Sequence, residues 1–285
     1  MKKIIATSLV AFALGLSVRT FATDFAGAVV DYTSGTLLNS DYDTGNPYNN
    51  PNAVLGQPGG IVGAGTAYTG VFSPFNPHYQ ATELTGIGHG GQLTLQLQNF
   101  VTVSSGAFEI GVWSNVGLTD TIDPYGTASA PASTFSTPVS AVVSVSSNGT
   151  DWVALNSGAP TTFGLPGNYY TNATTPFDAA APASPQLADF GKPFTGTLAD
   201  FNGETWSQVL ATLNGSAGGT WLNLDSTGLS QVGFIRFSGV ADGSELDLNA
   251  VSINSTLSGA SVPEPGSTGL LLLGGILVFG FWHRK

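Results

Sequence analysis

The chain has 285 residues, with 38 glycines, no cysteine and a formal net charge of −11. The absence of cysteine excludes disulfide bonds, thiolate metal sites and cysteine nucleophiles. The acidic balance disfavours nucleic acid as a partner, because a negative surface repels phosphate groups.

The N-terminus has the layout of a secretory signal peptide. Met1-Lys2-Lys3 is basic, and the segment from Ile4 to Val18 is apolar or small. Small residues at Thr20 and Ala22 suit a cut after Ala22. We therefore expect residues 1–22 to be a signal helix that is removed, and residues 23–258 to form one exported domain.

The exported body is much more acidic than the whole chain. Between Thr23 and Ser261 only Lys192 and Arg236 are basic, against seventeen acidic residues, which leaves a net charge of −15. With so few internal cations, most carboxylates must be solvated or gathered around a divalent ion.

Alternation of apolar and polar residues predicts an all-β body. The strand-like windows are residues 92–100, 107–113, 138–145, 231–240 and 244–253. Asn148-Gly149 suits a hairpin turn, after which Trp152 and Leu155 lie on the return strand. In the last window the phase of the alternation changes at Val251, which predicts a β-bulge.

One segment has helical spacing instead. Trp206, Val209, Leu210 and Leu213 recur at i, i+3, i+4 and i+7, with Asn202 as a start signal and Asn214-Gly215 as a stop. Residues 119–138 and 157–193 have loop composition. The predicted fold class is all-β, an antiparallel β-sandwich or jelly roll with one short amphipathic helix, flanked by the N-terminal signal helix and a C-terminal transmembrane-like helix.

The body offers little for catalysis. It has two histidines, His78 and His89, and no G-x-S-x-G sequence. We predict that the protein is not an enzyme and has no organic cofactor. Two acidic loops would suit calcium, one with Asp41 and Asp43 and the other with Glu245 and Asp247. The same acids can equally be solvated turn residues.

Aromatic residues crowd loops of the N-terminal third. Tyr42, Tyr48 and Tyr79 are the candidate contacts to sugar rings, and Tyr68, Phe72 and Phe75 lie near them in sequence. The alternative is that these rings close one end of the sandwich.

The C-terminus has three parts in order. These are Val262-Pro263-Glu264-Pro265, an apolar run over 267–282, and a basic end with Arg284 and Lys285. The run is shorter than the roughly twenty residues of a relaxed membrane span, and the basic end favours the cytoplasmic side. This layout closely resembles the PEP-CTERM sorting domain, which we place at residues 259–285.

That resemblance implies a route of export and proteolytic processing. PEP-CTERM proteins are exported by Gram-negative bacteria, inserted transiently in the inner membrane by the C-terminal helix, and cut near the motif by an exosortase. They reach the cell surface or extracellular matrix of bacteria that make exopolysaccharide, and members are often proposed to act in biofilm or floc formation.

A second resemblance concerns the body. AVVSVSSNGTDWVALNS, with NPNAVLGQP, GGQLTLQL, FEIGVWSN, GFIRFSG and LDLNAVSI in order, is similar to discoidin-like domains over residues 27–254. The resemblance implies a jelly roll whose loops at one end bind glycans or lipid headgroups.

These observations predict an exported, exosortase-processed surface or matrix protein that associates with exopolysaccharide. Two alternatives stay open: a structural or adhesive matrix component without a sugar site, and a carbohydrate-active enzyme.

Overall fold

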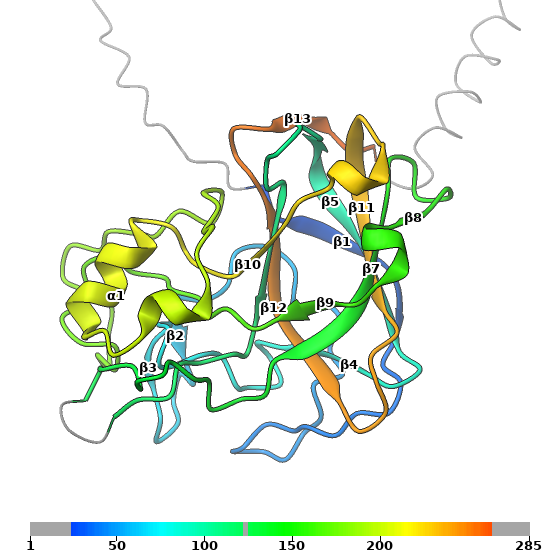
Figure 1. Cartoon of the computed structure of the whole chain (residues 1–285). Coiled ribbons are helices and arrows are strands. Elements are labelled where there is room, and N and C mark those ends of the chain that lie inside the picture. Colours follow the sequence, from blue (N-terminus) through cyan, green and yellow to red (C-terminus); the bar gives the residue numbers. More distant parts are fainter. Residues whose placement is uncertain (1–23, 122–124, 264–285) are drawn as a thin grey trace, which may run out of the picture.

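Figure 1 shows a computed structural model of the chain, which describes residues 24–121 and 125–263. The expected signal segment 1–22 lies outside the described residues, as do Glu264, Pro265 and the C-terminal apolar run with Arg284 and Lys285. The body between them is mostly β and its sheets are antiparallel, as the alternation predicted.

The larger sheet has seven strands. Its main path is β1 (Ala26–Thr33), β5 (Gln92–Thr102), β11 (Gln231–Ser238), β7 (Val139–Ser146) and β8 (Val153–Ala154). β13 (Ser258–Ser261) pairs with β5, and β9 (Thr161–Phe163) pairs with β7. The sheet therefore continues beyond residue 258, where the sequence suggested that the body ends.

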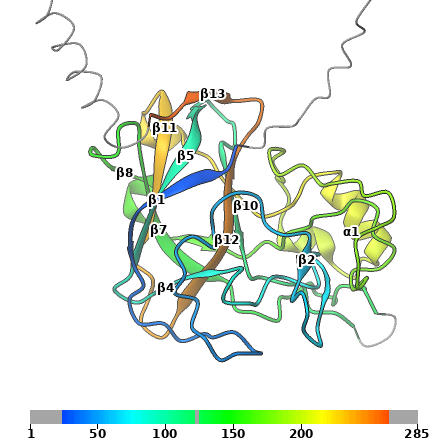
Figure 2. The ribbon, with the colours of Figure 1, turned by 180° about the vertical axis from the view of Figure 1, so that it is seen from behind.

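The second sheet has four strands in the order β10 (Thr220–Leu222), β6 (Ile110–Ser114), β12 (Glu245–Ile253) and β4 (Thr85–Gly88). The register of β12 against β6 shifts between Leu248 and Ala250. This irregularity confirms the β-bulge that the change of phase predicted. A separate pair, β2 (Ile61–Val62) and β3 (Gly70–Val71), lies beside the helix (Figures 1 and 2).

The main core lies between the two large sheets. Alternate residues of β5, Leu93, Leu95 and Leu97, are buried with Ile235 and Phe237 of β11. From the second sheet, β6 and β12 add their own apolar residues to the same cluster. Two packed antiparallel sheets with one shared core make the body β-sandwich-like.

A second, aromatic core covers the other face of the smaller sheet. Trp113 of β6 is fully buried and lies 5.0 Å from the Phe190 ring and 5.9 Å from Trp221, measured between ring centroids. All nine residues of β12 are buried as a result. Residues 157–193, expected to be a surface loop, instead supply Phe190 and Tyr170 to this core. Phe190 thereby packs this segment against Trp113 of the smaller sheet.

The only α-helix among the described residues is α1 (Trp206–Leu213), as the helical spacing predicted. Its N-cap is Thr205 rather than Asn202, because the Thr205 N–H donates to Gln208 Oε1 at 2.9 Å in a capping box. Asn214 ends the helix in the left-handed conformation, with φ of 48°. Short 3-10 turns occur at η1 (Leu155–Gly158), η2 (Leu198–Phe201) and η3 (Asp225–Thr227). No helix in residues 24–121 and 125–263 is long and apolar enough to cross a membrane.

Candidate functional site

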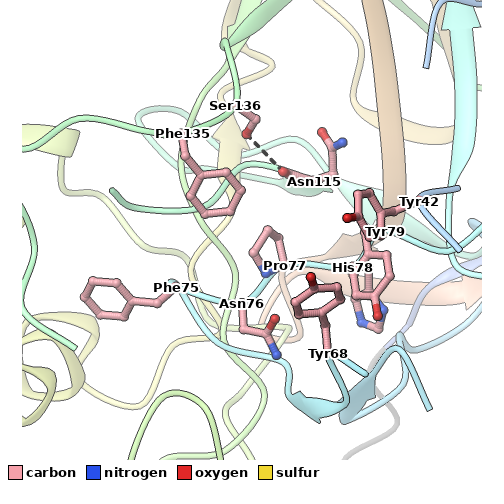
Figure 3. A pocket seen from close by; sticks show the side chains of 10 residues that line it. All are labelled: Tyr42, Tyr68, Phe75, Asn76, Pro77, His78, Tyr79, Asn115, Phe135 and Ser136. Carbon is pink, nitrogen blue, oxygen red and sulfur yellow. Dashed lines mark hydrogen bonds between the residues drawn. The ribbon is translucent and has the colours of Figure 1, made fainter. Parts of the chain in front are cut away.

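Two neighbouring pockets lie where the loop after β1 meets the start of β12 and residues 75–79. One has a volume of about 430 Å³ and is mostly aromatic. The other has a volume of about 580 Å³ and is acidic. Asn115 and Ser136 line both, and Ser136 Oγ donates to Asn115 O at 3.0 Å (Figure 3). The two pockets therefore form one composite site, which we call the groove.

The aromatic half of the groove presents rings to solvent. Tyr42 is 75 % exposed, Tyr68 59 % and Phe135 58 %. Tyr42 packs edge-on against Tyr68, with ring centroids 5.6 Å apart. Pro77 lies between Tyr68 and Phe135 in Figure 3, and Tyr79 also lines the pocket. Large exposed apolar side chains that gather in one concavity are typical of a binding surface.

Of the three predicted sugar contacts, two line this half and one supports it. Tyr42 and Tyr79 line the pocket. The Tyr48 ring is buried, and its hydroxyl donates to Tyr79 O at 2.7 Å. Tyr48 thus fixes the backbone behind Tyr79, while its own ring lines the acidic pocket.

A buried histidine and a half-buried glutamate hold the loop that carries Tyr79. His78 Nδ1 lies 3.2 Å from Glu83 Oε2, which also accepts the N–H groups of Tyr79 and Gln80 at 3.3 and 3.2 Å. Burial alone would raise the pKa of Glu83, but the His78 ring and the N–H groups of Gln80 and Gly63 lower it below its usual value. His78 is therefore a structural anchor of the groove.

The acidic half of the groove contains Glu245 and Asp247. They are two residues apart on β12, so their side chains leave the same face of the strand. Glu245 Oε2 accepts the N–H of Asn39 at 2.8 Å and also that of Leu38. Asp247 Oδ2 accepts the side-chain amides of Asn39 at 2.8 Å and Asn115 at 3.1 Å. The carboxylates thereby tie the loop after β1 to the sheet.

The second oxygen of each carboxylate, Oε1 of Glu245 and Oδ1 of Asp247, is buried without a hydrogen-bond partner among the described residues. Burial and the neighbouring Glu245 charge raise the pKa of Asp247 well above its usual range. Asp247 therefore keeps its proton to higher pH values than a surface carboxyl group does.

The other predicted calcium acids have a different role. Asp41 is buried, and Oδ1 accepts the N–H groups of Asp43 at 2.8 Å and Thr44 at 3.1 Å, while Oδ2 accepts that of Ala81 at 3.0 Å. Burial opposes its ionisation, but these N–H donors lower the pKa of Asp41. Asp43 is exposed. In the described part of the chain, no three His, Asp or Glu side chains converge as metal ligands, and calcium stays a prediction.

Comparison with known families concerns the other end of the chain. Residues 261–285 match the family model of the PEP-CTERM protein-sorting motif. The chain thus carries a PEP-CTERM sorting motif. This motif indicates an exported protein that is targeted by an exosortase and passes through a membrane-anchored intermediate. The comparison with curated proteins gives no match.

Sequence reasoning missed several groove residues, among them Asn115, Phe135 and Ser136. They follow β6 or belong to the loop 119–138, far in sequence from Tyr42. Phe135 is a single aromatic residue among Ser, Thr and Pro. Such a ring has no neighbouring strand residues to pack with, and this was the one signal in the sequence that it could belong to a binding site.

Proposed function

We propose that this exported, exosortase-processed protein acts at the cell surface or in the extracellular matrix by binding exopolysaccharide in the groove. The observation that carries the proposal is the clustering of exposed rings: Tyr42, Tyr68 and Phe135 converge on one pocket from three separate loops. Flat aromatic faces stack on the apolar faces of sugar rings, and neighbouring amides and carboxylates accept or donate hydrogen bonds to hydroxyl groups. Association of this kind fits a role in biofilm or floc formation.

The negative charge of the body and of the groove limits the kinds of polysaccharide that we expect to bind. The body carries −15 between Thr23 and Ser261, and the groove itself contains Glu245 and Asp247. In the described residues Lys192 donates to Asn214 O, and Arg236 lies 3.8 Å from the centre of the Trp152 ring. Neither cation lines the groove. We therefore propose neutral or amine-bearing sugars as ligands, because polymers of uronic acid would be repelled.

Binding by the processed protein to purified polysaccharides tests this proposal. We expect saturable binding to exopolysaccharide of the producing bacterium and to neutral polymers, with weaker binding to polyuronates at low salt. Replacing both tyrosines, Tyr42→Ala with Tyr68→Ala, should weaken binding by at least about tenfold, since central aromatic residues dominate such interfaces.

Tyr125 provides the matched control, because it is 75 % exposed, as Tyr42 is, and does not line the groove. Tyr125→Ala should bind as the wild type does. Absence of saturable binding would favour a structural or adhesive matrix component without a sugar site. Release of free sugars from the polymer would instead support the carbohydrate-active enzyme.

A further inference from the structure

The sorting motif begins inside the folded body. β13 pairs with β5, and directly after it the Val262 N–H donates to Gln98 O at 2.9 Å. The Val262 side chain is 7 % exposed. It lies over Gly233, where an added Cβ would come within 3.1 Å of Val262 Cγ2. The first residue of Val262-Pro263-Glu264-Pro265 is therefore packed as a core residue.

Gln96 closes over this segment. Its side-chain amide donates to Val262 O at 3.3 Å and to Pro263 O at 3.0 Å. A primary amide has two N–H hydrogens, so each carbonyl can receive one. Gln96 is 5 % exposed and lies opposite Ala28 of β1 and Phe234 of β11. Because strands flank it on both sides, its position is rigid.

The first described residue of the body, Asp24, is also bonded to β5. The Asp24 carboxylate accepts Asn99 Nδ2 at 2.5 Å and the hydroxyl of Ser258. Asn99 belongs to β5 and Ser258 to β13, which lie together at the top of the molecule in both views (Figures 1 and 2). The residues that follow the signal segment and those that precede the sorting motif thus stabilise one another.

An enzyme that cuts a peptide binds it as an extended chain with free backbone groups. Within residues 258–263, β13 is paired with β5 at Ser258 and Ser261, and the carbonyls of Val262 and Pro263 are bonded to Gln96. This segment can therefore enter an enzyme only after local opening. Three residues, Glu264, Pro265 and Gly266, separate Pro263 from Ser267, where the apolar run begins, so the Cα atoms of Pro263 and Ser267 can be at most about 14 Å apart. The peptide bonds that directly follow the bonded segment therefore lie on the C-terminal side of Pro263.

We propose that Gln96 is a positioning residue for processing: its clamp on Val262 and Pro263 confines the exosortase cut to the C-terminal side of Pro263. Val262 and Pro263 then stay on the mature protein. In the cut, one peptide bond breaks, its carbonyl carbon takes the oxygen of water or the nitrogen of an acceptor amine, and the released amine takes a proton. The inference rests on exosortase processing and is independent of polysaccharide binding.

The test is the C-terminal residue of the mature protein. The full chain is expressed in a bacterium with its exosortase, and the C-terminal peptide is identified by fragment-ion mass spectrometry. We expect a single product that ends between Pro263 and Ser267. Gln96→Ala should add shorter products that end before Val262, because the segment is released from the sheet.

Gln98→Ala is the matched control. It makes the same chemical change on the same strand, at an exposed side chain, and it keeps the backbone oxygen that accepts the Val262 N–H. It should give the wild-type product. A wild-type product that ends before Val262, or identical products from Gln96→Ala and Gln98→Ala, would overturn the proposal.

If the Gln96→Ala variant does not accumulate, hydrogen exchange at the Val262 amide tests the same proposal. In the folded wild-type chain, the Val262 amide should exchange far more slowly than in a free peptide of the same sequence. Exchange at the free-peptide rate would show that the clamp does not hold and would overturn the inference.

Discussion

The two ends of the sandwich are built in opposite ways. At the end where β13 leaves the sheet, backbone pairing and buried side chains fix the chain, and Val262 is 7 % exposed. At the other end, which is the lower end in Figures 1 and 2, the loop after β1 and the start of β12 contribute to the groove, where Tyr42 is 75 % exposed. Strands therefore secure the end of the body at residues 258–263, which we call the tether end, whereas loops present the rings of the groove at the opposite end.

The largest expected effect is at the tether end. A chain that stops after Leu257 lacks β13 and the buried Val262 side chain, and it leaves the Gln96 amide without its two acceptors. We expect a loss of about 3–5 kcal/mol in the free energy of unfolding. By calorimetry the melting temperature should fall by roughly 10 °C relative to a chain that stops after Pro263. Equal melting temperatures of the two chains would show that β13, Val262 and the hydrogen bonds of Gln96 do not stabilise the body.

The next effect concerns the acid pair of the groove. Because the pKa of Asp247 is raised in the folded state, its protonated form is favoured by folding. The stability that it contributes is fully present below its unfolded pKa and is lost as pH rises through the folded value. Asp247→Asn removes this loss, so the variant should melt a few degrees above the wild type at pH 8.

At pH 4 that gap should shrink or disappear, because Asp247 is then protonated in the folded protein. Thermal melts of both proteins from pH 4 to 8 measure the difference in melting temperature between variant and wild type. Asp41 and Glu83, whose contributions have the opposite pH dependence, are present in both proteins, so their effect cancels in this difference. A gap that widens as pH falls would contradict the raised pKa of Asp247.

A smaller effect tests how the aromatic wall is supported. Tyr48→Phe removes the hydroxyl that donates to Tyr79 O, and the ring itself stays. We expect a loss of about 1–2 kcal/mol in the free energy of unfolding, because a part-buried carbonyl is left without its donor. Urea unfolding measures it. Tyr125→Phe, at an exposed ring, should change nothing, and an equal loss in the two variants would refute the role of Tyr48.

The smallest expected effect is the change in the free energy of unfolding when an exposed ring of the groove is removed. Tyr42→Ala should change the free energy of unfolding by less than about 0.5 kcal/mol, as at other exposed positions. Urea unfolding of the variant checks this. A larger loss would mean that Tyr42 closes the end of the sandwich, the alternative that the sequence left open for these rings.

Much of the sheet could be predicted from alternation, because β5, β7 and β12 are each buried against the core in the expected phase, and the bulge in β12 follows from Val251. The path of residues 157–193 could not, because Phe190 and Tyr170 find their partners only through tertiary packing. The groove was predictable in part. Tyr42 and Tyr79 stand in two aromatic-rich loops, whereas Phe135 has only the weak signal of a lone ring in a polar loop and reaches the pocket by tertiary packing.

The most direct test is to ask which end of the protein the polysaccharide covers. Hydroxyl-radical footprinting of the processed protein, with and without saturating exopolysaccharide, reports the exposure of each ring. We predict protection of Tyr42, Tyr68 and Phe135, with no change at Tyr125 or Leu187, which are equally open to solvent outside the groove. Protection of Tyr125 or Leu187 with Tyr42, Tyr68 and Phe135 unchanged would contradict binding in the groove.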